Sequence, residues 1–199
     1  MIILGLTGSI GMGKSATAQM FRDEGVRVYD ADAAVHEIYN VGGSAVGPIG
    51  SAFPGTVKDN KVDRAALRDI VLNDAEALKR LEALVHPLVA ETQAKARAEA
   101  RSADADILVL DIPLLFETGG DQRVDYTLVV TTTAEEQRDR VMSRPGMTEA
   151  NFTAILAKQT PDHEKRARAD FVINTRIDHD YARDQVRALI AALRRQKEG

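Results

Sequence analysis

Five short apolar or β-branched blocks along the chain predict five buried strands. The blocks are Ile2–Leu6, Val26–Tyr29, Ile107–Leu110, Tyr126–Val130 and Phe171–Ile173. Helical patterning separates most neighbouring blocks, and strands that helices cover on both faces have compact apolar sequences of this kind. The pattern therefore predicts an α/β fold in which a five-stranded parallel sheet lies between two layers of helices, a three-layer sandwich.

Periodic apolar positions predict the helices that cover this sheet. The expected helices are Lys14–Arg22, Ala134–Met142, Glu149–Ala157 with Thr148 as its N-cap, and a last helix whose apolar positions are Val186, Leu189, Ile190 and Leu193. These four positions recur at i, i+3, i+4 and i+7, which indicates a stripe that faces the core.

Residues 30–106, between the second and third predicted strands, hold no convincing strand. Helical patterns instead cover Arg64–Leu72, Ala75–Leu84 and Leu88–Arg101. A simple crossover between parallel strands needs far less chain, so we expect a helical insertion beside the carboxyl ends of the strands, where ligands of open α/β sheets bind. The predicted division is a core of residues 1–30 and 104–199 and an insertion of residues 31–103.

Composition narrows the class of protein. The net charge is −4 with acids and bases interspersed, so no basic footprint points to nucleic acid. Cysteine is absent, the chain enters its first predicted strand within two residues, and no apolar run approaches the ~20 residues that span a bilayer. We therefore expect a cytoplasmic protein without a membrane partner, as a monomer or small homo-oligomer.

Residues 8–15 read Gly-Ser-Ile-Gly-Met-Gly-Lys-Ser, the G-x-x-x-x-G-K-S phosphate loop between a strand and a helix. Its glycines let successive backbone N–H groups point at phosphates, where Lys14 reaches the β/γ oxygens and Ser15 holds Mg²⁺. A turn that only joins a strand to a helix is the alternative, but a chance match occurs at about one in 30,000 positions. The motif predicts binding of ATP or another nucleoside triphosphate.

Two strand ends carry carboxylates. Asp30 and Asp32 follow the second predicted strand, and in extended geometry both would point into the ligand crevice, where a carboxylate takes a proton or holds Mg²⁺ through water. One of them acting only as the cap of a helix that begins at Ala33 is the alternative. Asp111 ends the third strand and is placed to orient Mg²⁺ opposite Ser15, unless it only begins a turn.

Arg140 and Arg144 are four residues apart, which on one helix places them on the same face. Two guanidinium groups on a mobile segment would close over a triphosphate, and we expect such a lid at residues 138–165. Pairing of these arginines with Asp139 or Glu136 on a solvated face is the alternative. Lys165 and Arg166 would also suit phosphates, but a run of charges at this place is better read as surface.

Two further motifs have plainer interpretations. Asn60-Lys61-Val62-Asp63 matches the guanine-reading signature of GTPases, but a helix follows it directly, so Asp63 is better read as an N-cap. His86 is expected to be structural or to contact substrate. The apolar residues after Asp111 line a substrate pocket or pack in the core.

Taken together, these residues resemble the dephospho-CoA kinases along nearly the whole chain. The resemblance rests on residues 5–15, Asp30-Ala31-Asp32, Val62-Asp63-Arg64, residues 84–89 around His86-Pro87, residues 113–117 (Pro-Leu-Leu-Phe-Glu), Gln137, Arg140, Arg144, Gln159, Lys165 and residues 169–173. One departure is Ile173-Asn174-Thr175-Arg176, where the family usually has Ile-Asp-Asn followed by Gly, so no adenine contact is assigned there.

The resemblance implies transfer of the ATP γ-phosphoryl group to the ribose 3′-hydroxyl of dephospho-CoA, giving CoA and ADP. It implies that Asp32 is the base and that Lys14 and Arg140 hold the transferring group. The implied nucleotide contacts are Gly8, Ser9, Ile10, Gly11, Met12, Gly13, Lys14, Ser15, Ala16 and Arg144, the acceptor contacts are Thr7, Asp32, His86, Leu114, Leu115 and Phe116, and the Mg²⁺ ligands are Ser15 and Asp111. Another small-molecule P-loop kinase and a nucleotide-dependent switch are the alternatives.

Overall fold

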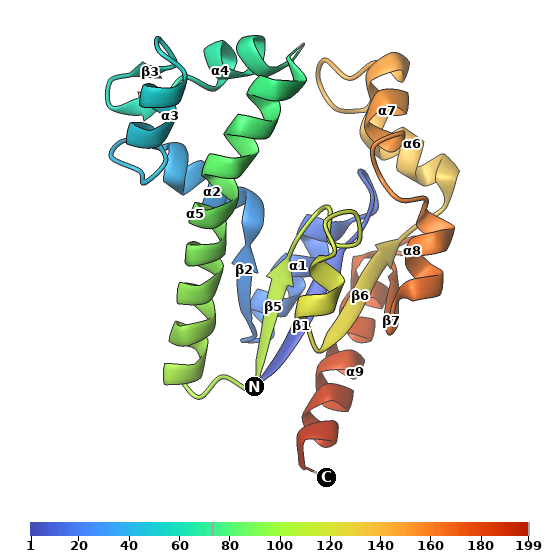
Figure 1. The fold of residues 1–199 in the computed structure, drawn as a ribbon. Helices are drawn as coiled ribbons and strands as arrows, with labels where there is room; N and C mark the ends of the chain where they lie inside the picture. The colour runs from blue at the N-terminus through green and yellow to red at the C-terminus, as the bar shows by residue number, and fades with distance from the viewer. Residues whose placement is uncertain (73, 199) are drawn as a thin grey trace. The chain divides into compact units, whose positions relative to one another are not determined.

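Residues 1–72 and 74–198 are described by a computed structural model of the chain. The chain divides into two compact units (Figure 1). The first unit comprises Met1–Tyr29 and Ala100–Gly199, and the second comprises Asp30–Glu99. Within the described residues, no helix is both long enough and apolar enough to cross a membrane.

A five-stranded sheet forms the centre of the first unit, in the order β2-β5-β1-β6-β7. Its strands are β1 (Ile2–Thr7), β2 (Arg27–Asp30), β5 (Ile107–Asp111), β6 (Tyr126–Thr131) and β7 (Phe171–Asn174). Strand β1 pairs in parallel with both β5 and β6, and its Leu4 lies opposite Val109 and Tyr126. All five predicted strands are confirmed, and the central position of β1 leads the chain that follows it to the middle of the sheet's carboxyl edge.

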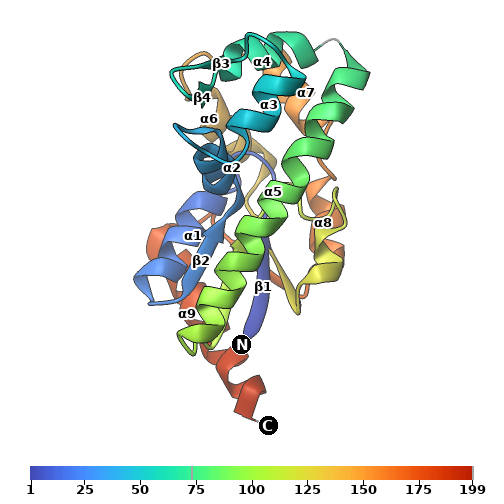
Figure 2. The same cartoon turned by 60° about the vertical axis from the view of Figure 1, so that its left-hand side comes forward.

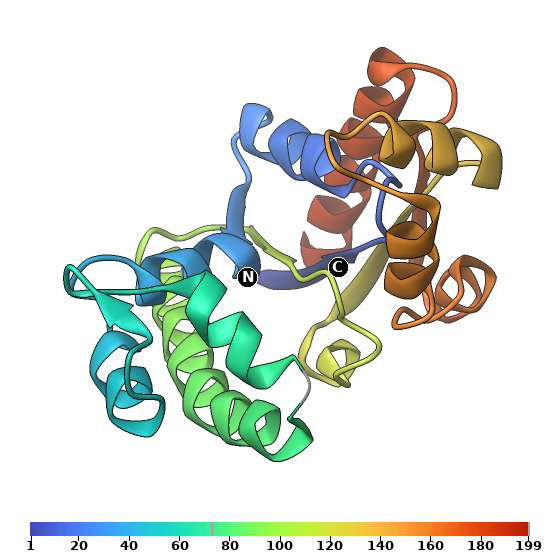
Figure 3. The same ribbon diagram turned by 90° about the horizontal axis from the view of Figure 1, so that it is seen from above.

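Most helices of the first unit were predicted from the sequence, and the exception is α8 (Asp162–Arg168). The helices are α1 (Lys14–Asp23), α6 (Ala134–Met142), α7 (Glu149–Leu156), α8 (Asp162–Arg168) and α9 (His179–Glu198), with a 3₁₀ turn at Gly120–Arg123. Helices α1 and α9 pack side by side against the sheet (Figure 3), and the predicted stripe on α9 lies in the same core as Leu4 and Phe21. The hydroxyl of Thr148 accepts from the Asn151 N–H, so the predicted N-cap of α7 is also confirmed.

The second unit holds a short hairpin that the sequence pattern did not indicate. Its elements are α2 (Ala31–Tyr39), α3 (Val46–Ala52), β3 (Val57–Lys58), β4 (Lys61–Val62), α4 (Arg64–Val71) and most of α5 (Ala75–Ser102). The hairpin turns at Asp59 and Asn60, which both have positive φ, as a two-residue turn of this hand requires. Strands of two residues are too short to show an alternating pattern, so the prediction of no strand here was wrong. The prediction that Asp63 is an N-cap is confirmed, because its carboxylate accepts from two N–H groups of α4.

Helix α5 is a single helix (Figure 2), whereas the sequence predicted a break around Pro87. Proline inside a helix removes one hydrogen bond and costs about 3 kcal/mol. Val85 is buried and Leu84 and Leu88 pack against the core of this unit on either side of the proline, while Pro87 itself is exposed. Packing of this apolar stripe therefore carries the helix through the proline.

An ion pair lies in the interior of the first unit, between Lys165 of α8 and Glu117 of the segment after β5. Their Nζ and Oε1 atoms are 2.9 Å apart, and the Lys165 side chain is 0% exposed. The prediction that Lys165 belongs to the surface was therefore wrong. Burial by itself raises the pKa of Glu117, but hydrogen bonds from Lys165 and from the Thr160 N–H outweigh it, so that this pKa is lowered. The pair ties the middle of α8 to the segment that follows β5.

Lys165→Met is expected to lower the free energy of unfolding by about 3–5 kcal/mol, because it leaves the Glu117 carboxylate buried without its cation. The double variant Glu117→Gln/Lys165→Met should recover much of that loss, since no charge then stays buried. Because the folded pKa of Glu117 is depressed, its contribution is present above the unfolded pKa and is lost as pH falls through the folded value.

Urea unfolding of both variants at pH 7 and at pH 4 measures these differences. The matched control is Arg166→Met, which removes a partly exposed ion pair of the same helix with Asp162 and should cost less than 1 kcal/mol. Equal losses in the single and double variants would contradict the assignment.

Candidate active site

The loop between β1 and α1 has a backbone that only glycine permits at several positions. Gly11 and Gly13 have φ of 80° and 95°, and Gly13 is the N-cap of α1. A Cβ on Gly8 would lie 2.8 Å from the carbonyl oxygen of Val130. Side chains are therefore excluded where the chain curls, and the loop ends at the N-terminus of α1, where a phosphate group is favoured.

Side chains from distant segments hold this loop in shape. The Gln137 amide donates to the Ile10 carbonyl at 2.8 Å, and the Gln159 side-chain oxygen accepts from the Ile10 N–H at 3.1 Å. The Met12 side chain is buried, and Ser15 and Ala16 are exposed in the first turn of α1. The two glutamines thus fix the middle of the loop and leave its helical end open.

Lys14 is held by Asp111, the last residue of β5. Its Nζ lies 2.6 Å from Oδ1 of Asp111, whose side chain is only 3% exposed. The register that pairs Leu6 with Asp111 brings the end of β1 beside the end of β5, so the loop that follows β1 returns its lysine to this carboxylate. The structure therefore brings together two residues that the sequence placed at the same edge of the sheet.

The side chain of Arg140, on α6, forms hydrogen bonds with Thr175, which also contacts the phosphate loop. One guanidinium nitrogen donates to the Thr175 hydroxyl at 2.9 Å, and the other donates to the Thr175 carbonyl and to Glu136, each at 2.7 Å. The Thr175 hydroxyl in turn donates to the carbonyl of Met12 at 2.9 Å. Thr175 thus connects the phosphate loop to Arg140, a role that sequence reasoning missed because its partners are 35 and 163 residues away.

Glu136 completes this set of charges. The Thr132 hydroxyl donates to its carboxylate at 2.6 Å, and this bond, followed by the charge of Arg140, lowers the pKa of Glu136 despite some desolvation. The expected alternative, in which Arg140 pairs with Glu136, is therefore part of the arrangement. The pair leaves one face of the guanidinium bonded to Thr175, next to the loop.

Arg144 does not share a helical face with Arg140. Helix α6 ends at Met142, and Arg144 lies beyond it with an exposed side chain. The prediction that the two arginines share a helical face was therefore wrong, because α6 ends two residues before Arg144. Arg144 stays a predicted nucleotide contact, because that prediction also rests on the family resemblance of the sequence.

Predicted acceptor contacts in the first unit differ in exposure. Thr7 is buried and its hydroxyl donates to the Pro113 carbonyl at 2.9 Å. Leu115 and Phe116 are buried in the core, and the Arg168 guanidinium lies 4.4 Å from the Phe116 ring centre. Leu114 is 39% exposed. Of these four side chains, Leu114 has most of the surface that a ligand would touch.

In the second unit, the structure separates the roles of Asp30 and Asp32. Asp30 is the N-cap of α2 and its carboxylate accepts from the Ala33 N–H at 2.9 Å, as the capping alternative proposed. Asp32 lies in the first turn of the helix with an exposed side chain, so the argument from extended geometry was wrong. His86 is exposed on α5.

Ser15 and Asp111 have oxygen atoms of the kind that Mg²⁺ takes beside phosphate, and the Asp111 carboxylate also binds Lys14. Within residues 1–72 and 74–198, no group of three or more His, Asp or Glu residues is arranged to hold a metal. Mg²⁺ in phosphoryl-transfer sites keeps several waters and takes one or two protein oxygens beside those of the phosphates. An exposed hydroxyl at the helix end and a carboxylate at the end of β5 supply such a pair.

Comparison with known proteins identifies the family that the chain resembles. The family model for dephospho-CoA kinase matches residues 2–179. A dephospho-CoA kinase from Mesorhizobium japonicum is 57% identical over 197 residues, covering 99% of both chains. Among solved structures, a protein from Thermus thermophilus has 36% identity and a TM-score of 0.83, covering 96% of this chain and 97% of its own. Dephospho-CoA kinase from Campylobacter jejuni has 25% identity and a TM-score of 0.67, covering 96% of each chain.

Thr175→Val is expected to weaken binding of a non-hydrolysable ATP analogue with Mg²⁺ by about tenfold, because Arg140 and the Met12 carbonyl both lose a hydrogen bond. Isothermal titration calorimetry measures the affinity. The matched control is Thr175→Ser, which keeps the hydroxyl and should bind as the unchanged protein does. Equal affinity in the valine variant would show that Thr175 does not support the loop.

Proposed function

The chain belongs to the dephospho-CoA kinase family, and we propose that Lys14, Arg140 and Asp32 carry its chemistry. The enzyme transfers the γ-phosphoryl group of ATP to the ribose 3′-hydroxyl of dephospho-CoA, the final step of coenzyme A synthesis. The family match confirms the resemblance stated from the motifs, and it sets aside the other small-molecule kinases and the switch protein. The remaining proposal concerns which residues perform the transfer.

The observation that carries this proposal is that two cations, Lys14 and Arg140, are each fixed by a protein partner beside the phosphate loop. Lys14 is bound to Asp111 and Arg140 to Thr175, and Thr175 in turn binds the loop. Phosphoryl transfer needs little covalent chemistry from the protein, so catalysis consists mainly of positioning and charge stabilisation. Cations already fixed beside the loop meet that need without reorganisation during the reaction.

Lys14 would bind the β- and γ-phosphate oxygens, and Arg140 would stabilise the charge of the group in transfer. Ser15 and Asp111 would hold Mg²⁺, which neutralises phosphate charge when bound. The ammonium of Lys14 is balanced by a buried carboxylate until the triphosphate offers it further acceptors. This pairing keeps Lys14 in place and lowers the cost of burying it.

Asp32 would act as the base that removes the proton of the acceptor hydroxyl. It stands two residues after the end of β2, the strand next to β5 in the sheet order, and its side chain is exposed. In the described part of the chain its carboxylate has no ion pair or capping bond, whereas that of Asp30 is used as a cap. A carboxylate with free oxygen atoms at this point suits proton removal.

The second unit would receive the acceptor, and residues 138–165 would act as the lid. Leu114 and His86 are proposed acceptor contacts because their side chains are exposed. Thr7, Leu115 and Phe116 would support the acceptor site from within the core. Arg144 is proposed to reach the nucleotide from the lid.

Lys14→Ala is expected to lower kcat by about 10²–10³-fold, the range found when one charge-stabilising donor is removed. Coupled detection of ADP with dephospho-CoA as acceptor measures the rate, and a melting curve reports the folded fraction. Lys95→Ala, which changes an exposed lysine of α5, is the matched control and should leave kcat unchanged. A near-normal kcat in Lys14→Ala would remove Lys14 from the mechanism.

Asp32→Asn is expected to lower kcat by about 10²–10⁴-fold, because the amide cannot take the hydroxyl proton. The dissociation constant for dephospho-CoA should change by less than threefold, since the side chain keeps its size and an oxygen that accepts a hydrogen bond from the hydroxyl. Rapid-quench turnover and equilibrium titration measure the two quantities separately. Weakened binding with an unchanged kcat would make Asp32 a residue that only positions the acceptor.

A further inference from the structure

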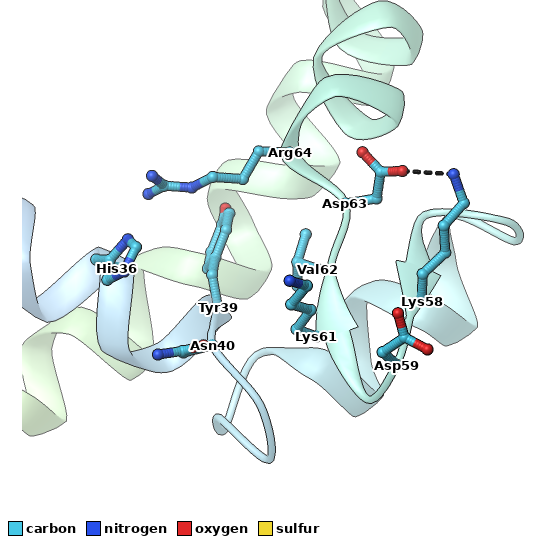
Figure 4. Close-up of a pocket in the computed structure, with 9 residues that line it drawn as sticks. All are labelled: His36, Tyr39, Asn40, Lys58, Asp59, Lys61, Val62, Asp63 and Arg64. Atoms are coloured by element: carbon cyan, nitrogen blue, oxygen red, sulfur yellow. Dashed lines mark hydrogen bonds and ion pairs between the residues drawn. The ribbon is translucent and has the colours of Figure 1, made fainter.

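A cavity of about 520 Å³ lies within the second unit (Figure 4). Helix α2, the hairpin of β3 and β4, and the first residue of α4 supply its walls. Its lining includes His36 and Tyr39 of α2, Lys58 and Lys61 of the hairpin, and Arg64. None of these residues was assigned a role by the phosphate loop or by the proposed transfer chemistry.

Of the two carboxylates in the lining, Asp63 is paired with one of the three permanent cations, and Asp59 forms no ion pair within the described part of the chain. Lys58 lies 2.6 Å from Asp63, whose carboxylate also caps α4. That bond, and more weakly the charge of Asp59, raises the pKa of Lys58. In the described part of the chain, neither Lys61 nor Arg64 has a carboxylate partner. The cavity therefore keeps two cations that form no ion pair with a carboxylate, and its lining has one more permanent cation than it has carboxylates.

The hairpin register adds to this excess of positive charge. Lys58 and Lys61 are Cα partners in the antiparallel pair, so their side chains leave the same face of the hairpin directly opposite each other. Like charges in this position are destabilising, and Asp63 offsets only one of them. A bound anion would relieve the repulsion that remains at Lys61.

Tyr39 orients the second unbalanced cation. The Arg64 guanidinium lies 5.4 Å from the centre of the Tyr39 ring, and Figure 4 shows Arg64 extending over that ring toward His36, away from the pair of Lys58 and Asp63. Burial raises the pKa of the Tyr39 phenol and Arg64 opposes that shift, so the hydroxyl stays protonated at neutral pH as a donor. A planar fork fixed in this way suits the oxygens of a phosphate group.

Helix α2 links this cavity to the proposed base. Asp32, His36 and Tyr39 are at i, i+4 and i+7 and so share one face of the helix. At 1.5 Å per residue, His36 lies about 6 Å and Tyr39 about 10 Å along the axis from Asp32. In dephospho-CoA the first phosphorus of the diphosphate is five bonds from the 3′-oxygen, roughly 6 Å. An acceptor whose hydroxyl meets Asp32 therefore places its diphosphate near the cavity when it lies along α2.

We propose that this cavity binds the diphosphate group of dephospho-CoA, with Arg64 and Lys61 as its cationic ligands. His36 and Tyr39 supply a ring nitrogen and a hydroxyl at the end nearer Asp32. The inference rests on the proposed role of Asp32, which sets where the reacting hydroxyl lies. Such a site would favour an acceptor that carries a diphosphate over one that offers only a ribose.

Steady-state kinetics of Lys61→Gln and Arg64→Gln at saturating ATP and Mg²⁺ test the proposal. The KM for dephospho-CoA should rise about tenfold in each, because a charged hydrogen bond to phosphate is lost, while kcat and the KM for ATP stay within twofold. Lys61→Arg should keep a low KM. Lys79→Gln, at an exposed lysine of the same unit, is the matched control and should behave as the unchanged enzyme.

Each other result overturns the inference. An unchanged KM for dephospho-CoA in both glutamine variants would show that the cavity does not hold the acceptor. A parallel rise in the KM for ATP would assign the cations to the nucleotide instead. If the unchanged enzyme turns over dephospho-CoA and Asp32→Asn abolishes turnover, either of these two results contradicts only the role of the cavity and leaves the proposed base in place. Unchanged kcat in Asp32→Asn would mean that the proposed base has failed first.

Discussion

A buried carboxylate at the end of β5 holds the lysine of the phosphate loop, and the geometry of the nucleotide site depends on this contact. Asp111 sits in the interior, where an unpaired charge is costly, so Lys14 must stay beside it. The parallel register of β1 and β5 brings the two chain segments together. Strand pairing thus sets the position of a cation at the point where phosphate charge would arrive.

Two further cations of the first unit also have fixed partners. Arg140 is held by Glu136 and Thr175, and Lys165 by Glu117. The bond to Glu136 lies within α6, whereas the bonds from Arg140 to Thr175 and from Lys165 to Glu117 join segments that are distant in the chain. Fixed partners keep the charges in place before any ligand binds. The cost of bringing positive charge to the triphosphate is therefore met largely during folding, which is the meaning of electrostatic preorganisation.

Local sequence was enough to predict the strands, most helices and the phosphate loop, because each leaves a pattern within a few residues. Long-range packing explains what it could not predict. Helix α5 continues through Pro87 because Val85 is buried and the leucines on both sides of the proline pack against the core of the second unit. Lys165 is interior because Glu117, far away in the chain, meets it there. Thr175 supports Arg140 and Met12 through contacts that no motif encodes.

The contrast between local motifs and long-range contacts also distinguishes the phosphate loop from the proposed phosphate site in the second unit. The loop before α1 binds through backbone N–H groups, so its requirement is a run of glycines at set spacing, which is visible in the sequence. The cavity of the second unit depends on side-chain charges from a helix, a hairpin and a helix start, and on carboxylates that balance some of those charges but not others. Lys61 and Arg64 look like ordinary surface residues until the pairing of Lys58 with Asp63 shows which charges remain. A site made from unbalanced charge is therefore recognised only by accounting for every ion pair around it.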